Sequence, residues 1–570
     1  MDFTLRIGGK AGQGLPVIGG VLAKHFSRSG FHVFTHQDYM SRIRGGHNFY
    51  QIRFADHKIS CSRDNIDLLL ALDADTINIH RHNLSDIGKI LYDPEMCGAV
   101  PGKELIAIPF TDLVNELDVN HIMVNSAAVG AVLALLGQKL HPFDEIFGSF
   151  ISQKGAEVIA TNVMVAQAGF DYARREWPGQ FSLSSPGNDK KNMLMNGNQA
   201  IGLGALMSGC KFYSAYPMPP STGIMDYLAS KAEEHGVVVE QAEDEISAIN
   251  MALGASYAGV RAMTATSGGG FALMTEGVSL AGITETPIVV AEVQRPGPAT
   301  GLPSRTEQSD LFFVIHGGHG EFAKVVFTPG TPEQAFYLTN KAFQMAEKYQ
   351  VPVFVQSDQY LADSQWSLSG FKADKVLQED FRLRGQQLNT LENYQRYAYT
   401  KKGISPLAIP GESRHLVVVD SDEHDQDGHI IEDGETRNEM VAKRLFKKIP
   451  HIQEEIEPPQ LYGDQKPDFL LVGFGSTYGV LKEAVDNLRE QWAFAMLHFS
   501  EVYPFPLTDK FDYVSLLNQA ITICVENNAT GQFANLLRLE TGYRCNHLIN
   551  RYDGRPFGLE SLLGELYDYL

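Results

Sequence analysis

Short apolar runs that end in loops of glycine, proline, hydroxyl and charged residues recur along this chain of 570 residues. Each run has the length of a buried strand, and segments with helical spacing of apolar residues separate the runs. Such alternation of strands and helices predicts parallel sheets with helices packed on their faces. We therefore expect an α/β protein built from several doubly wound domains.

Four segments in the middle of the chain carry the groups that could do chemistry, and each lies near the end of such a run. They are residues 216–222 (YPMPPST), 243–249 (EDEISAI), 266–271 (TSGGGF) and 294–303 (QRPGPATGLP). Ligands bind where the carboxyl ends of parallel strands meet, so an acid, a cation and several close-approach loops should lie together there. No sequence motif for a metal, a phosphate group or an electron carrier completes the set. The pattern predicts half of an active site.

Glu245 is the candidate acid. It opens a helix rich in alanine and glycine, where a buried carboxyl group could exchange a proton with a heterocyclic nitrogen. The simpler interpretation is that the acids at 243–245 only complement the dipole of that helix, an effect of about 0.3–1 kcal/mol.

Arg295 is the candidate cation. It follows an apolar strand directly, and the Pro-Gly-Pro after it cannot continue the strand, so a stiff loop presents its guanidinium fork to a carboxylate. An ordinary surface arginine is the alternative. Ser304 and Arg305 could add a hydroxyl and a second cation, although a structural role is favoured for them.

A glycine-rich stretch, residues 8–14 (GGKAGQG), follows the first predicted strand and precedes a helix. Backbone N–H groups at a helix N-terminus can bind phosphate, which makes Gly8, Gly9, Gly12 and Gly14 candidates. The stretch lacks the Gly-Lys-Ser/Thr ending of a P-loop, so a bare turn is equally possible. The cation Arg44, next to Gly45 and Gly46, favours the phosphate interpretation.

Bulk properties exclude several classes of protein. The net charge of −21 argues against binding to nucleic acid, which requires a basic surface. No run of 18 or more uncharged apolar residues indicates a membrane span, and the first residues do not resemble a signal peptide. The five cysteines are scattered and include no Cys-x-x-Cys pair, so we expect reduced, buried thiols in a cytoplasmic protein and no metal site in this chain.

Changes in composition suggest the domain organisation. We expect a first domain over residues 1–185, a polar linker near 181–198, and a second domain over 195–365 that holds the four segments. Residues 366–412 lose periodicity and form a second linker, and 413–570 form a C-terminal domain. The acidic stretch 420–427 is either solvated or in contact with a partner.

Taken together, these motifs resemble those of the α subunits of 2-oxoacid:ferredoxin oxidoreductases that carry a fused N-terminal γ domain. The similarity is greatest to the 2-oxoglutarate:ferredoxin oxidoreductase (2-oxoglutarate synthase) branch and extends over the whole chain. It rests on the four segments above, on residues 8–14 and 44–46, and on three later signatures. These are residues 403–411 (GISPLAIPG), 525–532 (VENNATGQ) and 554–557 (GRPF).

The resemblance implies a thiamine diphosphate-dependent oxidation of a 2-oxoacid, with coenzyme A as acyl acceptor and ferredoxin as electron acceptor. It implies a pyrimidine-binding middle domain and a C-terminal domain similar to that of transketolase. A separate β subunit would carry Mg²⁺, the diphosphate site and a [4Fe–4S] cluster, in an α2β2 assembly. The γ domain would help hold coenzyme A.

The same resemblance assigns roles to residues. Glu245 would hydrogen-bond the thiamine aminopyrimidine, and Arg295 would bind the substrate carboxylate with Ser304 beside it. The candidate residues are, for thiamine, Glu245, Thr266, Ser267 and Gly268; for the substrate, Arg295, Ser304, Arg305, Tyr216, Pro217, Ser221 and Thr222; and for coenzyme A, Gly8, Gly9, Gly12, Gly14 and Arg44.

One position departs from the family pattern. Pro219 stands where the family's Y-P-I-T-P-S loop has threonine, and proline offers neither a hydroxyl nor an N–H. Ser221, Thr222 or a neighbouring subunit would have to replace that contact. Pyruvate, branched-chain or aryl 2-oxoacids remain alternative substrates, a non-catalytic scaffold subunit remains an alternative role, and the direction of the reaction is open.

Overall fold

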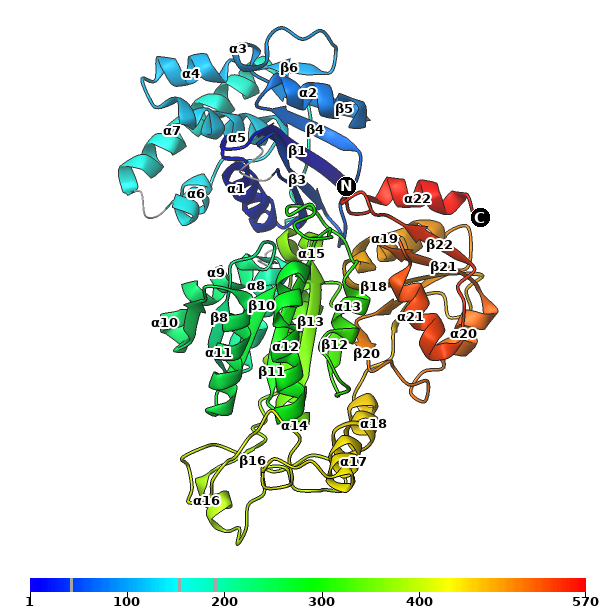
Figure 1. The fold of residues 1–570 in the computed structure, drawn as a ribbon. Coiled ribbons are helices and arrows are strands. Elements are labelled where there is room, and N and C mark those ends of the chain that lie inside the picture. Colours follow the sequence, from blue (N-terminus) through cyan, green and yellow to red (C-terminus); the bar gives the residue numbers. More distant parts are fainter. Residues whose placement is uncertain (41–44, 152–154, 188–191) are drawn as a thin grey trace. The chain divides into compact units, whose positions relative to one another are not determined.

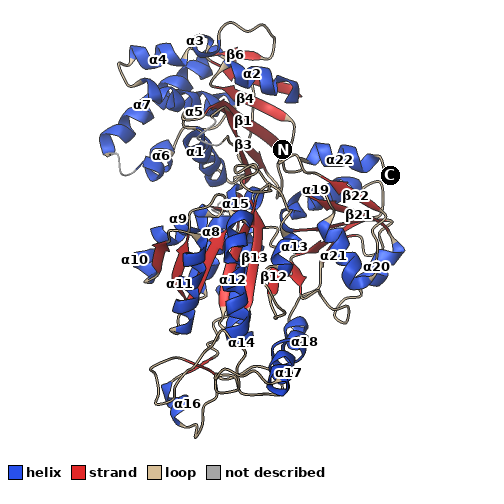
Figure 2. Ribbon diagram, viewed as in Figure 1, coloured by secondary structure: helices blue, strands red, loops and turns tan. Residues whose placement is uncertain are grey.

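The computed structural model describes residues 1–40, 45–151, 155–187 and 192–570. It groups them into two compact units, each with its own core (Figures 1 and 2). The first unit comprises Met1–Met195, Ser364–Gly370 and Phe557–Leu570, and the second comprises Asn196–Asp363 and Phe371–Pro556. The α/β class predicted from the sequence is confirmed.

The first unit is built on a sheet whose order, over the described residues, is β6-β5-β4-β1-β3-β2-β14-β7. Its central strand β1 (Asp2–Lys10) pairs in parallel with β4 (Ile66–Ala71) and antiparallel with β3 (His47–Ala55). The remaining strands are β2 (His32–Asp38), β5 (Leu84–Tyr92), β6 (Leu105–Ala107), β7 (Met193–Met195) and β14 (Trp366–Leu368). Antiparallel β3 is not predicted from the sequence.

Helices α1 (Leu15–Arg28), α5 (Val124–Leu135) and α7 (Ala156–Glu176) contribute to the core of this unit. α5 and α7 approach closely because both carry glycine at the contact. A Cβ on Gly130 would lie 1.8 Å from the Ala166 carbonyl oxygen, and one on Gly169 would lie 2.1 Å from that of Ala127.

The last helix of the chain, α22 (Leu559–Tyr567), also belongs to the first unit. Glu560 binds the side chain of Arg63 (2.8 Å) and the backbone N–H of Asp64 (2.7 Å). The sequence-based division places residues 557–570 in a C-terminal domain, whereas this pairing groups them with the N-terminal sheet. The predicted linker near 181–198 is not wholly irregular either, because it contains β7.

The second unit contains a sheet of order β20-β12-β13-β11-β10-β8-β9 over the described residues. Its parallel strands are β8 (Cys210–Ala215), β9 (Val238–Gln241), β10 (Arg261–Thr266), β11 (Ile288–Gln294), β12 (Val325–Phe327) and β13 (Pro352–Asp358). β20 (Glu501–Tyr503) closes one edge antiparallel to β12. The central strands are buried along their length, as expected for a parallel sheet covered on both faces.

Helices α8 (Gly197–Met207) and α14 (Pro332–Tyr349) pack together in this unit, as do α11 (Glu245–Tyr257) and α12 (Gly268–Thr284). A separate sheet follows in the order β17-β19-β18-β21-β22. Its strands are β17 (Gln460–Gly463), β18 (Phe469–Phe474), β19 (Phe494–Phe499), β21 (Ile521–Glu526) and β22 (His547–Asn550).

The predicted linker and the acidic stretch are held to the second unit by buried charges. Glu285, at the end of α12, is fully buried and pairs with Lys443 and Lys448, while Arg396 donates to its carbonyl oxygen at 2.7 Å. Within the acidic stretch Glu423 pairs with Arg444. Part of this stretch therefore folds into the chain and is not simply solvated.

Candidate functional site

The candidate site lies at the carboxyl ends of neighbouring parallel strands in the second unit. β11, β10, β8 and β9 are adjacent in that order and run in the same direction. The segment at 294–303 follows β11, 266–271 follows β10, 216–222 follows β8, and 243–249 follows β9. The expectation that these loops share one edge agrees with this topology.

Glu245 is the first residue of α11 and is only 3 % exposed. The preceding Asp244 caps the helix, with its Oδ1 accepting from the Ser247 N–H at 2.8 Å, so Glu245 is not needed for that purpose. The buried Oε1 of Glu245 has no hydrogen-bond partner among the described residues. Burial raises the pKa of Glu245, which favours a carboxyl group that can hold or donate a proton.

The first turn of α12, just after β10, packs directly against this carboxyl group. A Cβ on Gly270 would lie 2.4 Å from Glu245 Oε1 and 2.1 Å from Thr266 Oγ1. Thr266 and Ser267 are fully buried, and Ser267 Oγ has no partner within the described structure. The glycines of this turn therefore allow a close approach, and the turn presents an unused hydroxyl.

Arg295 joins the loop after β11 to the loop after β8. Its NH1 donates to the Pro219 carbonyl oxygen at 2.6 Å, and burial lowers the pKa of its guanidinium. This contact uses a backbone oxygen, which proline retains although it lacks the threonine hydroxyl usual in the family.

The two hydroxyls after Pro219 differ in their availability. Ser221 Oγ donates to the Met218 carbonyl oxygen at 2.7 Å, so it stabilises the turn. Thr222, the first residue of α9 (Thr222–Ser230), has a buried Oγ1 without a partner in the described chain. Of these two hydroxyls, only that of Thr222 is left unused within the described chain. Pro217 is half-buried, and Tyr216 is 40 % exposed.

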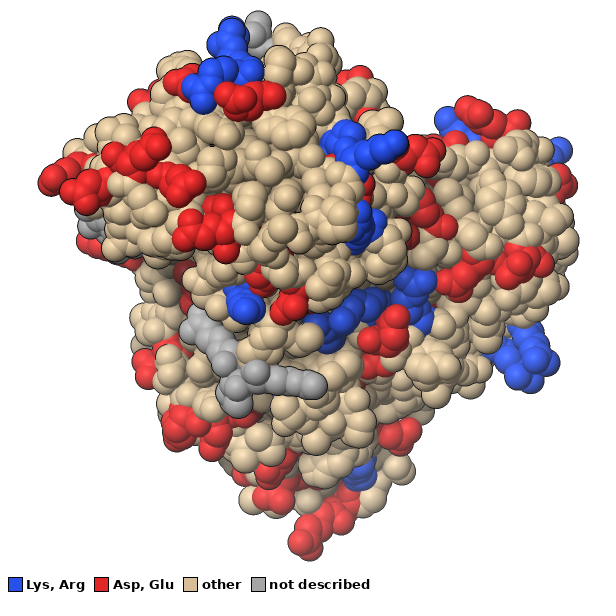
Figure 3. All heavy atoms as spheres, turned by 90° about the horizontal axis from the view of Figure 1, so that it is seen from above, with Lys and Arg blue, Asp and Glu red and all other residues tan. Residues whose placement is uncertain are grey.

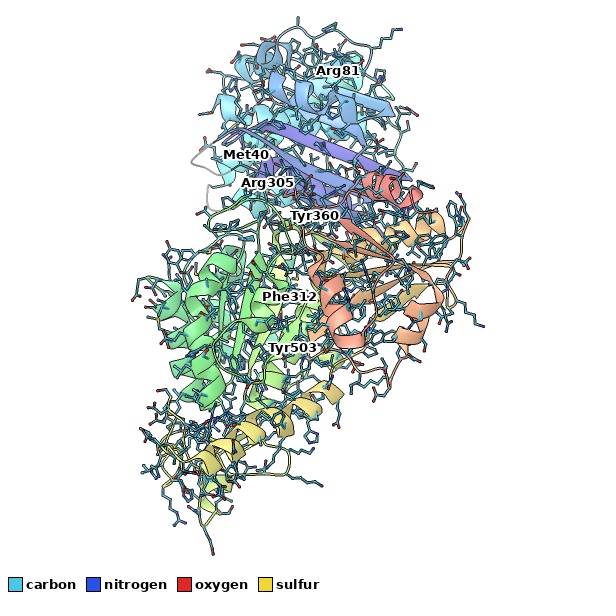
Figure 4. All side chains as sticks on the ribbon, turned by 45° about the vertical axis from the view of Figure 1, so that its right-hand side comes forward. Met40, Arg81, Arg305, Phe312, Tyr360 and Tyr503 are labelled. Carbon is cyan, nitrogen blue, oxygen red and sulfur yellow. The ribbon has the colours of Figure 1, made fainter. Side chains whose placement is uncertain are left out.

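Ser304 and Arg305 lie in a buried segment that later parts of the chain fix in place. Arg305 is labelled in Figure 4. The N–H of Thr306 donates to the Gly554 carbonyl oxygen at 3.3 Å, and a Cβ on Gly554 would lie 3.1 Å from Arg305 Cβ. The N–H of Gln308 donates to the Asn527 carbonyl oxygen at 2.6 Å. The signatures at 525–532 and 554–557 thus support the segment that carries Arg305.

Sequence reasoning missed Glu292 and Asp310. Glu292 lies in β11 directly beside Thr266 of β10 and is fully buried. Asp310 Oδ2 lies 2.2 Å from the position of a Cβ on Gly268. A charged residue inside an otherwise apolar strand was the available signal for Glu292.

The N-terminal glycines divide into two groups. Gly8 and Gly9 lie inside β1, not in a loop, and Cβ atoms there would collide with Thr76 (2.4 Å) and Gln13 (2.4 Å). The predicted loop is therefore shorter, and only Gly12 and Gly14 remain at the N-terminus of α1, both with positive φ. Arg44 lies outside the described residues.

A buried group of cationic and imidazole side chains near this turn was also missed. His47 Nε2 lies 2.8 Å from His80 Nε2, and His80 Nδ1 lies 3.1 Å from Arg6 NH1. Burial, aided by Arg6, lowers the pKa of His80 to about 3, so His80 is neutral at physiological pH.

We also searched the described residues for a metal site and for a membrane-spanning helix. No group of three or more His, Cys, Asp or Glu is arranged to hold a metal ion in the described part of the chain, and no described helix is long and apolar enough to cross a membrane. All five cysteines are buried and unbridged. On the face in Figure 3, acidic and basic side chains are interspersed.

Comparisons with known proteins agree with this architecture. A family model described as the thiamine diphosphate-binding domain of pyruvate flavodoxin/ferredoxin oxidoreductase matches residues 203–443, and one described as pyruvate ferredoxin/flavodoxin oxidoreductase matches residues 4–172. The α subunit of 2-oxoacid:ferredoxin oxidoreductase 2 of Aeropyrum pernix is 32% identical, covering 98% of this chain and 96% of its own.

Two further relatives are named for 2-oxoglutarate. A solved structure of 2-oxoglutarate:ferredoxin oxidoreductase from Magnetococcus marinus, with 2-oxoglutarate, coenzyme A and succinyl-CoA bound, is 31% identical with a TM-score of 0.91, over 100% of this chain and 99% of that one. The 2-oxoglutarate synthase subunit KorA of Methanocaldococcus jannaschii is 34% identical over 55% of this chain and 83% of its own.

The chain thus belongs to the α subunits of the 2-oxoacid:ferredoxin oxidoreductases. The family resemblance inferred from the sequence is confirmed. It includes the predicted N-terminal domain, because the pyruvate ferredoxin/flavodoxin oxidoreductase model matches residues 4–172. As an α subunit, the chain works with partner subunits.

Proposed function

We propose that this chain is the catalytic α subunit of a 2-oxoglutarate:ferredoxin oxidoreductase. The reaction converts 2-oxoglutarate, coenzyme A and oxidised ferredoxin into succinyl-CoA, carbon dioxide and reduced ferredoxin, and it is reversible. The observation that carries the catalytic role is the buried carboxyl group of Glu245, which has an unpartnered oxygen at the edge where the strand ends converge.

Thiamine diphosphate fits the residues at this edge. Its aminopyrimidine ring needs a carboxyl group at one ring nitrogen and close approach by small residues, and Glu245, Ser267 and the glycines from Gly268 to Gly270 offer these features. When bound, thiamine supplies the carbon nucleophile and electron sink for decarboxylation of a 2-oxoacid. Glu245 would hold and move the proton at the ring nitrogen.

The substrate contacts follow from the charges available. Arg295, fixed by the Pro219 carbonyl oxygen, would bind the carboxylate next to the oxo group, with Thr222 Oγ1 and Ser304 as neutral partners. A dicarboxylic substrate needs a second cation, and Arg305 is the candidate in this chain. The choice of 2-oxoglutarate is supported by the likeness to the Magnetococcus marinus enzyme over the full length.

The rest of the assembly is also a proposal. A β subunit would provide Mg²⁺, the diphosphate site and a [4Fe–4S] cluster, and the complex would be α2β2. Gly12 and Gly14 at the N-terminus of α1 would contact a phosphate group of coenzyme A, where backbone N–H groups favour an anion.

The test is to purify the chain with its β subunit and measure viologen dye reduction on a panel of 2-oxoacids, with coenzyme A present or omitted. We expect turnover on 2-oxoglutarate that requires coenzyme A. Turnover only on pyruvate, branched-chain or aryl 2-oxoacids would support the proposed mechanism but contradict the assignment of 2-oxoglutarate as the substrate. A complex loaded with thiamine diphosphate and cluster that turns over none of them would support the scaffold role.

A further inference from the structure

A buried asparagine on α8 contacts the loop that follows β8. Asn198 is 2 % exposed, and its Nδ2 donates to the Pro220 carbonyl oxygen at 2.8 Å. A carbonyl oxygen can only accept a hydrogen bond, so this contact fixes which way the amide points. The other amide atom, Oδ1, is buried and has no hydrogen-bond partner among the described residues.

The start of α8 does not depend on Asn198. The N-cap is Asn196, whose Oδ1 accepts from the Gln199 N–H at 2.9 Å, while Gln199 Oε1 accepts from the Asn196 N–H at 3.1 Å. This capping box already satisfies the first turn of the helix. Buried polar atoms are almost always paired, and an unpaired one costs stability. The contact with the loop is therefore the feature that accounts for Asn198.

Two side chains hold successive carbonyl groups of this loop. Arg295 NH1 donates to the carbonyl oxygen of Pro219 at 2.6 Å, and Asn198 holds the next carbonyl group. Proline has no N–H, so these carbonyl groups are all that the dipeptide 219–220 offers for backbone hydrogen bonds. A shift of this dipeptide would move the acceptor that orients the Arg295 guanidinium. It would also move Thr222, whose Oγ1 is unpartnered in the described chain.

The first turn of α9 leaves room for the Asn198 amide. Gly223 is the second residue of that helix, and a Cβ on it would lie 2.8 Å from Asn198 Nδ2. The backbone of Gly223 does not lie in the left-handed region, so its φ does not require glycine. The neighbouring amide is what requires the absence of a side chain there.

We propose that Asn198 is a positioning residue, which holds the loop of residues 216–222 through the Pro220 carbonyl oxygen and thereby orients Arg295 and Thr222 toward the 2-oxoacid. This inference rests on the proposed function of the site, in which Arg295 binds the substrate carboxylate. Arg295 would bind that carboxylate equally in the ground state and in the transition state. Loss of its orientation should therefore raise the KM and leave kcat nearly unchanged.

The experiment compares two variants with the wild type in the purified complex with the β subunit. Asn198→Asp keeps the shape of the side chain, but its carboxylate cannot donate to Pro220. Gly223→Ala leaves Asn198 in the chain and displaces its amide with the new Cβ. Both should raise the KM for the 2-oxoacid about tenfold. Dye reduction should show kcat within about threefold of the wild type and an unchanged KM for coenzyme A.

Two comparisons separate positioning from a merely structural role. Asn196→Ala removes the capping box of the same helix, so it should lower the melting temperature and leave both KM values unchanged. Alanine is more favourable than glycine in a helix, so a raised KM in Gly223→Ala would not reflect a weaker fold, and this variant decides the question if Asn198→Asp does not fold. A wild-type KM for the 2-oxoacid in Gly223→Ala, or an equal increase in Asn196→Ala, would overturn the inference.

Hydrogen–deuterium exchange of the same complexes provides a readout that does not depend on turnover. The amides of residues 216–230 should exchange faster in Asn198→Asp and Gly223→Ala than in the wild type. In Asn196→Ala the faster exchange should be confined to α8. Unchanged exchange at 216–230 in the first two variants would overturn the positioning role. The exchange rates test that role even if the complex turns over no 2-oxoacid, so its failure is distinguishable from failure of the proposed function.

Discussion

Arg295 NH1 and the Pro219 carbonyl oxygen lie 2.6 Å apart, which links the loops that follow β11 and β8. A charge-assisted hydrogen bond to a backbone oxygen is strong and fixes the direction of the guanidinium. The contact does not depend on the side chain at 219, so proline is compatible with it. The remaining N–H groups of Arg295 keep a defined orientation for a carboxylate.

Replacing Arg295 by lysine should raise the KM for the 2-oxoacid by about 10- to 100-fold, because one charge remains but the bidentate geometry is lost. The KM for coenzyme A should not change. Steady-state dye reduction with each substrate varied in turn checks this. Equal increases in both KM values would contradict a specific role for Arg295 in binding the 2-oxoacid.

Glu245→Gln should form a normal complex and lose about 100- to 10,000-fold in turnover, because the amide cannot exchange the proton. Glu243→Gln is the matched control, since Glu243 is exposed and bonded only to Ser247 Oγ within the described chain. Dye reduction and size-exclusion chromatography of both variants provide the measurement. A fully active Glu245→Gln complex would support a scaffold.

The difference in stability between the wild type and Glu245→Gln should change with pH in a defined direction. The pKa of Glu245 is raised in the folded state, so the wild type loses stability as pH rises from the ordinary value of 4.5 through the raised value. Glutamine does not titrate. The melting temperature of the wild type should therefore fall relative to that of Glu245→Gln as the pH rises from 4.5 to 8. A difference between the two melting temperatures that stays constant over this range would contradict the raised pKa.

Gly270→Ala should lower activity about 100-fold, because the new Cβ would displace the Glu245 carboxyl group and the Thr266 hydroxyl. Gly269→Ala is the control: its Cβ meets nothing nearer than the Ala299 carbonyl oxygen at 3.8 Å. Alanine in a helix is more favourable than glycine by about 1 kcal/mol, so the control should be at least as stable as the wild type. If Gly270→Ala were as active as Gly269→Ala, the position of the Glu245 carboxyl group would not be needed for catalysis.

Thr222→Val and Ser221→Ala should behave differently. Ser221→Ala removes a turn hydrogen bond and should cost about 1 kcal/mol of stability with an unchanged KM. Thr222→Val removes a hydroxyl without a described partner, so stability should hold while the KM for the 2-oxoacid rises. Thermal unfolding and kinetics of the two proteins decide between them, and the reverse pattern would assign the hydroxyl contact to Ser221.

The sequence by itself determined the class of the fold and the edge of the sheet at which the chemistry gathers. Apolar runs of strand length alternating with helical spacing define parallel strands, and the residues after β8, β9, β10 and β11 must then meet at their carboxyl ends. For this reason Glu245 and Arg295 could be assigned to this edge of the sheet from spacing and residue type alone.

Only the tertiary structure decided which groups remain available for a ligand. Ser221 and Thr222 are neighbours with the same kind of hydroxyl, yet one is used by a turn and the other is not. Gly8 and Gly9 belong to a glycine-rich stretch, but pairing with β3 and β4 extends β1 through them. Glu292 accepts a hydrogen bond from Gln356, 64 positions along the chain, and such long-range contacts depend on packing that no local pattern encodes.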